Sequence, residues 1–304
     1  MALVTLLDGG MGQELVRRSK YKPHPLWSAN ILMHEAWLVK ELHQAYIEAG
    51  ARVITLNSYS ITPERLQAHE LEHEFVPLQN RAIQIAREAR DQSEHSVSIA
   101  GCLPPLVASY RPDKAPDFER CLQTYRRIVE VQAPHVDVFL CETLSSIKEA
   151  KAAAKAINES GKACWLSFSL SDDIAHVLRS NEPLEKAIKN LLESADLKAI
   201  LLNCSSPETI DQSISMVVEQ AKPIGVRTGA YANGFISIKD LKPGGTVENL
   251  DARKDLTPHE YTKFALNWLK KGAHILGGCC EITPQHIQHL SQTLLKKGHQ
   301  INHL

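Results

Sequence analysis

The stretch His274-Ile275-Leu276-Gly277-Gly278-Cys279-Cys280, followed by Glu281-Ile282-Thr283-Pro284, contains the unit from which the rest of the chain is built. A short apolar run ends in two glycines and two adjacent thiols, and Thr283-Pro284 has the residue types of a helix N-cap and first turn. This order predicts a buried strand that leads through a turn into a helix. Packing alone explains two thiols at a strand end poorly, so the turn is also a candidate functional site.

The same unit recurs upstream along the chain. Apolar runs occupy residues 3–7, 52–56, 97–100, 136–141, 164–170, 198–202, 223–227 and 273–276. Helical spacing or helix signals follow at residues 34–49, 77–90, 118–132, 146–159, 184–193, from Pro207 onward, and at 284–297. Eight runs that alternate with helical segments are typical of an α/β fold with buried parallel strands. We therefore expect a single (β/α)₈ TIM barrel that spans residues 1–304 as one catalytic domain.

A doubly wound open sheet is the alternative fold, because periodicity does not distinguish a closed sheet from an open one. The count of eight favours the barrel, and the first run is not followed by the dinucleotide fingerprint G-x-G-x-x-G. The longest irregular stretch, at about residues 228–257, follows the predicted seventh strand. A loop of that length in a compact domain is typically a lid or a binding loop.

The composition favours a cytoplasmic protein whose partners are small molecules. Lys and Arg number 34 against 35 acidic residues, with 43% hydrophobic residues, and no basic stripe indicates nucleic acid or a membrane surface as a partner. No run approaches the ~18 apolar residues of a membrane span, and Asp8 interrupts the apolar N-terminal run short of a secretory signal. Seven cysteines, an odd number, predict reduced thiols rather than a disulfide framework. The oligomeric state is not predicted.

Active sites of barrels are assembled at the C-terminal ends of the strands. The residues expected there are Asp8-Gly9-Gly10, Asn57, Tyr59, Cys102, Glu142-Thr143, Ser169, Asn203-Cys204, Tyr231, Asn233 and Cys279-Cys280. Cys204 of the sixth unit could converge with Cys279 and Cys280 of the eighth, provided that Gly277-Gly278 bends the chain so that both sulfurs face inward. Three thiolates around Zn²⁺ would leave a fourth tetrahedral position open, as in catalytic zinc sites.

Other interpretations of these residues remain open. A buried free cysteine is often a small hydrophobic residue, which fits Cys121 and Cys164 best. Cys279 and Cys280 could instead form a redox pair or supply a nucleophile, which would need a nearby histidine as base. An acid at a strand end such as Asp8 can simply complement a helix dipole. Asp8 together with Glu142, facing a metal and a glycine turn, favours a binding site for a substrate ammonium group.

Six segments in a fixed order carry a resemblance to a known family. They are Asp8-Gly9-Gly10-Met11-Gly12-Gln13-Glu14-Leu15, Thr55-Leu56-Asn57-Ser58-Tyr59, Glu142-Thr143, Asn203-Cys204-Ser205, Tyr231-Ala232-Asn233 and Gly277-Gly278-Cys279-Cys280. With these segments the chain resembles the homocysteine S-methyltransferase family. The resemblance implies a zinc-containing barrel that transfers a methyl group to the sulfur of homocysteine and so forms methionine.

The resemblance also implies a role for individual residues. Cys204, Cys279 and Cys280 would bind Zn²⁺ and act in catalysis together with Glu142. Asp8, Gly9 and Glu142 would lie near the ammonium and carboxylate ends of the amino acid. Asn203 would orient the neighbouring thiolate or the substrate, and Tyr59 and Tyr231 would line the methyl-donor side.

The length of the chain suits the short family members that use S-methylmethionine or S-adenosylmethionine as the methyl donor. Departures from the family pattern concern the donor pocket: Gln13 replaces a usual threonine, Ala232 replaces a proline, and Pro104-Pro105 begins an unusual loop that continues through Tyr110-Arg111-Pro112. Two alternatives follow. The scaffold could methylate a different thiol or a selenol, or it could be a catalytically silent zinc-binding barrel.

Overall fold

A curled parallel sheet forms the centre of the molecule in the computed structural model, which describes residues 1–22, 24–238, 241 and 250–304. The strands are β1 (Leu3–Leu6), β2 (Val53–Thr55), β3 (Ser98–Leu103), β4 (Val138–Leu144), β5 (Ala163–Phe168), β6 (Leu197–Asn203), β7 (Arg227–Tyr231), β8 (Ile275–Leu276) and β9 (Gln300–Asn302). They pair in the order β2-β3-β4-β5-β6-β7-β8-β1-β9. A parallel bridge between Leu7 and Val53 joins β1 to β2 and closes the barrel.

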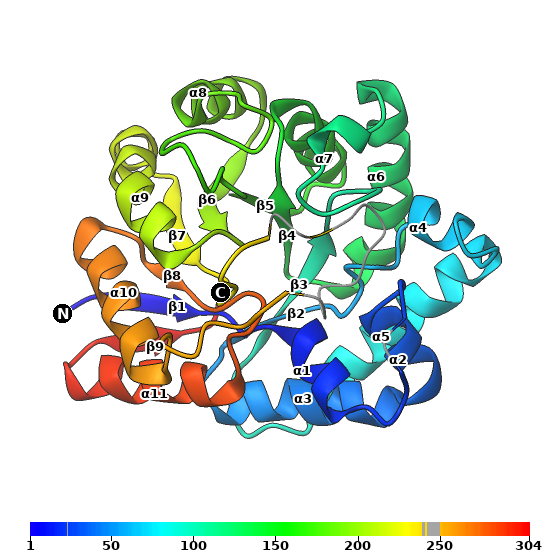
Figure 1. Cartoon of the computed structure of the whole chain (residues 1–304), viewed down its shortest axis with the longest axis horizontal. Coiled ribbons are helices and arrows are strands. Elements are labelled where there is room, and N and C mark those ends of the chain that lie inside the picture. Colours follow the sequence, from blue (N-terminus) through cyan, green and yellow to red (C-terminus); the bar gives the residue numbers. More distant parts are fainter. Residues whose placement is uncertain (23, 239–240, 242–249) are drawn as a thin grey trace.

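The helices surround this sheet, as Figure 1 shows. They are α1 (Met11–Arg18), α2 (Ser28–His34), α3 (Ala36–Glu48), α4 (Pro63–Gln67), α5 (Phe75–Asp91), α6 (Phe118–Gln132), α7 (Ile147–Glu159), α8 (Leu184–Ser194), α9 (Pro207–Ala221), α10 (Pro258–Lys271) and α11 (Pro284–Lys296). Side chains at the N-caps of α4, α6, α7, α9 and α10 accept the first free backbone N–H groups. None of the described helices is long and apolar enough to cross a membrane.

Two layers of apolar side chains hold the barrel together. The larger layer lies between the sheet and the helices, and it includes the fully buried Tyr46, Phe139 and Trp268. A smaller cluster, which includes Leu140, Trp165 and other strand residues, forms a separate core. The predicted TIM barrel is therefore confirmed, and its packed strands leave the chemistry to the strand ends and the turns that follow them.

The structure corrects the predicted seventh strand. Residues 223–227 were expected to form it, whereas Lys222–Ile224 is a 3₁₀ turn that ends at Gly225 in the left-handed region, and β7 runs from Arg227 to Tyr231. The centre of this strand, Thr228-Gly229-Ala230, carries small side chains because space beside β8 is limited. A Cβ added to Gly229 would lie 2.6 Å from the carbonyl oxygen of Ile275.

Three further boundaries differ from the sequence prediction. The helix expected at 34–49 is observed as α3, Ala36–Glu48, whereas α2, which ends at His34, was not predicted. The irregular stretch expected at 228–257 begins only after β7, and its part at 239–240 and 242–249 lies outside the described residues. The short strand β9 was not predicted; it pairs with β1 from Leu3 to Thr5.

Candidate active site

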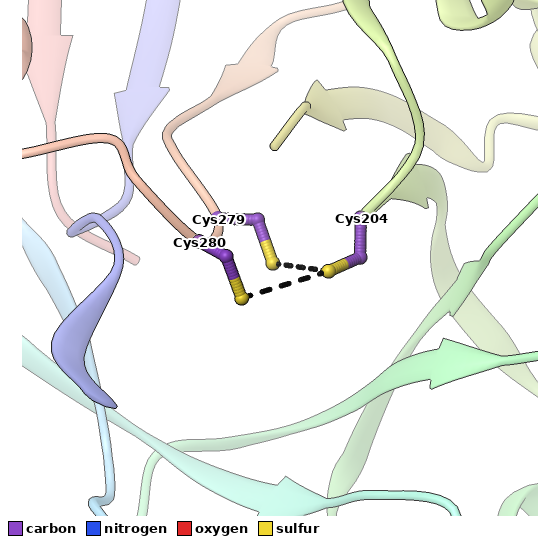
Figure 2. A group of neighbouring side chains, drawn as sticks. All are labelled: Cys204, Cys279 and Cys280. Carbon is purple, nitrogen blue, oxygen red and sulfur yellow. Dashed lines mark hydrogen bonds between the residues drawn. The ribbon is translucent and has the colours of Figure 1, made fainter. Parts of the chain in front are cut away.

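Three cysteine thiols from two turns meet at the C-terminal end of the barrel. Cys204 follows β6, and Cys279 and Cys280 follow β8, with β7 between the two strands. The Sγ atom of Cys279 lies 2.9 Å from that of Cys204, which lies 3.9 Å from that of Cys280. All three sulfurs lie within 4.8 Å of one another, and Figure 2 shows them pointing toward a common point. The convergence that the sequence predicted is present.

Two glycines make the bend that presents Cys279 and Cys280. A Cβ on Gly277 would lie 2.5 Å from Cβ of Leu7, and one on Gly278 would lie 2.2 Å from Cγ2 of Ile282. The turn is fixed to its neighbours because the Gly278 N–H donates to the Asp8 carbonyl and the Cys279 N–H donates to the Ala232 carbonyl, both at 2.9 Å. Only glycine fits at these two positions with the backbone as it stands.

Hydrogen bonds among the three thiols shift their pKa values in opposite directions. Burial opposes ionisation of Cys204, but hydrogen bonds from Cys279, Cys280 and the Tyr110 hydroxyl outweigh it, so that the pKa of Cys204 lies well below its ordinary value. The pKa values of Cys279 and Cys280 are raised, first of all because each thiol donates its proton to Cys204. Ionisation of all three thiols together requires a compensating positive charge. A donor set of three sulfurs thus fits a soft metal cation.

Glu142 lies inside β4, two residues before its end at Leu144, whereas the sequence placed it directly after the strand. Burial raises its pKa to about 7, against the hydrogen bond that its carboxylate accepts from the Cys102 thiol at 3.0 Å. Strand β4 is irregular at this point, since its register against β5 shifts between Cys141 and Leu144 and Thr143 has a φ of 61°. The irregularity directs Glu142 into the pocket.

Asn203 holds that irregularity in place. Its Oδ1 accepts the Thr143 backbone N–H at 2.9 Å, and its Nδ2 donates to the Thr143 hydroxyl at 3.0 Å. The same Nδ2 lies 3.9 Å from Sγ of Cys279. Asn203 does not line the pocket, so its contacts are with the protein side of the site.

Asp8 and Gly9 form the opposite wall. The carboxylate of Asp8 accepts the Thr55 backbone N–H at 2.8 Å, yet burial raises its pKa to about 8, with the charge of Glu142 adding to the effect. A Cβ on Gly9 would lie 2.3 Å from the Ile282 carbonyl oxygen, so this turn packs directly against the Cys279–Cys280 turn. Two carboxyl groups with raised pKa values in one pocket favour a cationic ligand group between them.

Four aromatic side chains complete the lining, of which the sequence predicted two. Tyr59 bonds through its hydroxyl to Ser109, and the Tyr231 hydroxyl has no hydrogen-bond partner among the described residues although it is buried. Trp27 and Tyr110 were not predicted. The ring centroid of Trp27 lies 6.0 Å from that of Tyr59, and the two rings meet edge to face. Trp27 lies in a loop without periodicity. Tyr110 belongs to the proline-rich loop that was already marked as unusual.

The pocket formed by these residues is concave and acidic. Its empty space, counted with its open mouth, is about 780 Å³. Among the described residues that line it, none is a lysine, arginine or histidine. No histidine base therefore lies against the thiols in that part of the chain, which disfavours the nucleophilic-thiol interpretation.

The barrel, the thiol cluster and the acidic pocket together define the site of an α/β-barrel enzyme whose three thiols could hold a metal ion. The model of the family described as homocysteine S-methyltransferase matches residues 5–294. Homocysteine S-methyltransferase YbgG from Bacillus subtilis is 31% identical over 94% of this chain and 93% of its own length. The chain therefore belongs to the homocysteine S-methyltransferase family, and it is a methyltransferase.

Other relatives agree with this assignment. The crystal structure of the homocysteine methyltransferase MmuM from Escherichia coli in its metallated form superposes with a TM-score of 0.79 at 25% identity, covering 95% of this chain and 96% of that one. A selenocysteine Se-methyltransferase from Brassica oleracea is 28% identical over 96% of this chain and 89% of its own length.

Proposed function

We propose that the enzyme transfers a methyl group from a sulfonium donor, S-methylmethionine or S-adenosylmethionine, to the thiolate of L-homocysteine and so forms methionine. The observation that carries the proposal is the cluster of three sulfurs within 4.8 Å of one another in the wall of a pocket whose described charged side chains are the acids Asp8 and Glu142. Such a pocket suits two substrates that each carry a positive charge.

Zinc is the metal we assign to Cys204, Cys279 and Cys280. Three thiolates are a donor set that Zn²⁺ binds with one position left open. When bound there, the metal supplies the charge that keeps the acceptor thiol deprotonated near neutral pH, where a free thiol is mostly protonated. The fit rests on the geometry of the donor set, because the three sulfurs lie within 4.8 Å of one another.

The acceptor amino acid would bind between the two turns. Asp8 and Glu142 would hold its ammonium group, and each carboxylate would ionise more readily once that positive charge is in place. The backbone at Gly9 lies close enough to the pocket to meet the carboxylate end. Asn203 would act from outside the pocket lining, because its side chain bonds to the irregular part of β4 and lies against the Cys279 sulfur.

The aromatic side would bind the methyl donor. A sulfonium cation is attracted to the faces of Trp27, Tyr59 and Tyr231, which line the pocket. The acceptor thiolate attacks the methyl carbon, a new C–S bond forms, and the donor leaves as a neutral thioether with the electron pair of the broken bond. Orientation of the two substrates in line lowers the barrier, and loss of the positive charge weakens the contact between the product and the aromatic faces.

The alternative acceptor is a selenol or a different thiol, and the selenocysteine Se-methyltransferase relative is the observation in its favour. A silent zinc-binding barrel is less well supported, because all three sulfurs are retained and converge.

A donor and acceptor panel tests the proposal. Zinc-loaded enzyme is incubated with L-homocysteine or L-selenocysteine and, separately, S-methylmethionine, S-adenosylmethionine or betaine, and methylated products are measured by mass spectrometry. Methionine from a sulfonium donor is expected, with no product from betaine. Methylation of the selenol alone would favour the alternative acceptor, and no product from any pair would contradict the proposal. The one-domain organisation and the cytoplasmic location stay predictions.

A further inference from the structure

Tyr110 is held at both ends of its side chain beside the thiol cluster. Its hydroxyl lies 2.8 Å from Sγ of Cys204, and the guanidinium of Arg179 lies over its ring at 4.7 Å from the centroid. The three residues come from separate segments, after β3, after β5 and after β6. The side chain of Tyr110 therefore links the guanidinium of Arg179 to the sulfur of a candidate metal ligand, in addition to lining the pocket.

Arg179 is itself fixed before it meets Tyr110. Its side chain is only 8% exposed and forms an ion pair with Asp172 at 3.1 Å. Its Nε donates to the Ser169 hydroxyl at 2.8 Å, and its Nη2 donates to the backbone carbonyl of Cys204 at 3.4 Å. The guanidinium therefore holds the backbone of Cys204 and the ring of Tyr110 at the same time.

The backbone at both ends of the hydroxyl–sulfur contact is strained. Tyr110 has a φ of 61° and Cys204 a φ of 48°, in a region that residues with side chains rarely occupy. Strained residues persist where the surrounding structure determines their conformation, and they are concentrated at functional sites. Here the surrounding structure is the Arg179 network.

We propose that Tyr110, clamped by Arg179, is a positioning residue that donates a hydrogen bond to the Cys204 sulfur and thereby fixes the direction and electron density of that thiolate in the metal-bound enzyme. The inference rests on the proposed function in one respect, the assignment of a metal to Cys204, Cys279 and Cys280. A thiolate bears no proton, so the hydroxyl is the donor in this contact. Partners of this kind orient metal ligands, and their removal commonly lowers metal affinity 10–100-fold.

The test compares Tyr110→Phe with Tyr125→Phe. Each change removes one tyrosine hydroxyl that makes a hydrogen bond, but the hydroxyl of Tyr125 donates to the Pro104 carbonyl, at the start of the same loop. Zinc affinity is measured by competition with a chelator, and the sulfur-to-metal charge-transfer band is recorded after substitution with Co²⁺. We expect Tyr110→Phe to bind zinc about 10–100-fold more weakly. Its band should move to longer wavelength, because a thiolate without a hydrogen bond gives up an electron more easily.

Tyr125→Phe should leave both readouts at the wild-type values. Arg179→Lys keeps the charge but not the planar group over the ring, and it should weaken zinc binding in the same direction by a smaller factor. Wild-type affinity and an unshifted band in Tyr110→Phe would overturn the inference, and wild-type affinity in Arg179→Lys would overturn the clamp.

The two proposals fail separately. A wild-type protein that binds no metal would overturn both of them. Metal binding with the expected shift, but without methyl transfer in the donor panel, would overturn the proposed function and leave the role of Tyr110 supported.

Discussion

The thiol of Cys102 donates a hydrogen bond of 3.0 Å to the carboxylate of Glu142, so that a fully buried side chain of β3 orients a pocket side chain of β4. Cys102 does not itself line the pocket. The sequence placed Cys102 among the strand-end residues expected at the site, whereas the structure shows that it contacts Glu142 from outside the pocket lining. A hydrogen bond to an ionised group contributes about 1.5 kcal/mol or more, which is enough to affect substrate binding.

Cys102→Ala should therefore raise the KM for L-homocysteine about 10-fold, the equivalent of about 1.4 kcal/mol, because Glu142 loses the donor that orients it. The value of kcat and the zinc content should change little. Cys102→Ser retains a donor at this position and is the control, with a KM close to that of the wild type. Equal KM values in the alanine and serine variants would show that the contact does not act on the acceptor.

Removal of Cys204 should remove the metal. The purified protein is expected to carry about one zinc per chain by elemental analysis, and Cys204→Ser should lose most of it, because two thiols remain where three are needed. Cys121→Ser is the matched control, since Cys121 is a buried cysteine of α6 whose thiol donates to the Pro116 carbonyl. Retention of zinc by Cys204→Ser would rule out the three-sulfur site.

The sequence predicted the elements whose signals are local. The helix expected at 118–132 is observed as Phe118–Gln132, since an Asp117 N-cap and an amphipathic pattern define it without help from the rest of the fold. The seventh strand was misplaced because its position depends on a neighbour. Gly229 and Ala230 are small to fit beside β8, which a search for apolar runs does not detect.

The site residues also divide into those that the sequence pattern predicted and those whose position depends on the rest of the fold. Cys204, Cys279 and Cys280 were predicted to converge because the C-terminal ends of barrel strands meet in space. Trp27, Tyr110 and Arg179 were missed, since they reach the site from loops whose path no periodicity encodes. The proline-rich segment before Tyr110 was the one available signal, and it marked the right loop without the residue.

Gly278 should be essential for the geometry of the metal site. In Gly278→Ala the new Cβ would lie 2.2 Å from Cγ2 of Ile282, so that the turn must shift, with a loss of stability of about 1–3 kcal/mol. We expect a lower zinc content as well, because Cys279 and Cys280 follow directly. Gly298→Ala is the control, since Gly298 has a φ of 80° and open space around its Cα. It should lose some stability in urea unfolding but keep its zinc, whereas equal zinc content in both variants would contradict the role of the bend.

His43 should make the fold sensitive to acid. It is fully buried in α3, neither ring nitrogen has a partner among the described residues, and burial lowers its pKa from 6.5 to about 4. Between these values the unfolded chain binds a proton that the folded protein does not, so the free energy of unfolding falls as the pH drops from 6.5 to 4. Buried acids such as Glu149, whose pKa burial raises to about 7, act in the opposite sense, so the effect of His43 must be isolated by comparison with a variant.

In chelator-treated protein, the free energy of unfolding in urea should fall between pH 7.5 and pH 5 by about 2 kcal/mol more in the wild type than in His43→Leu, which places an apolar side chain of similar size at this position. His73→Gln is the control, because His73 is exposed in a surface turn and its replacement should leave the pH profile as in the wild type. A wild-type profile that coincides with that of His43→Leu would mean that His43 is protonated inside the fold. In that case an acceptor for its N–H groups must exist near α3.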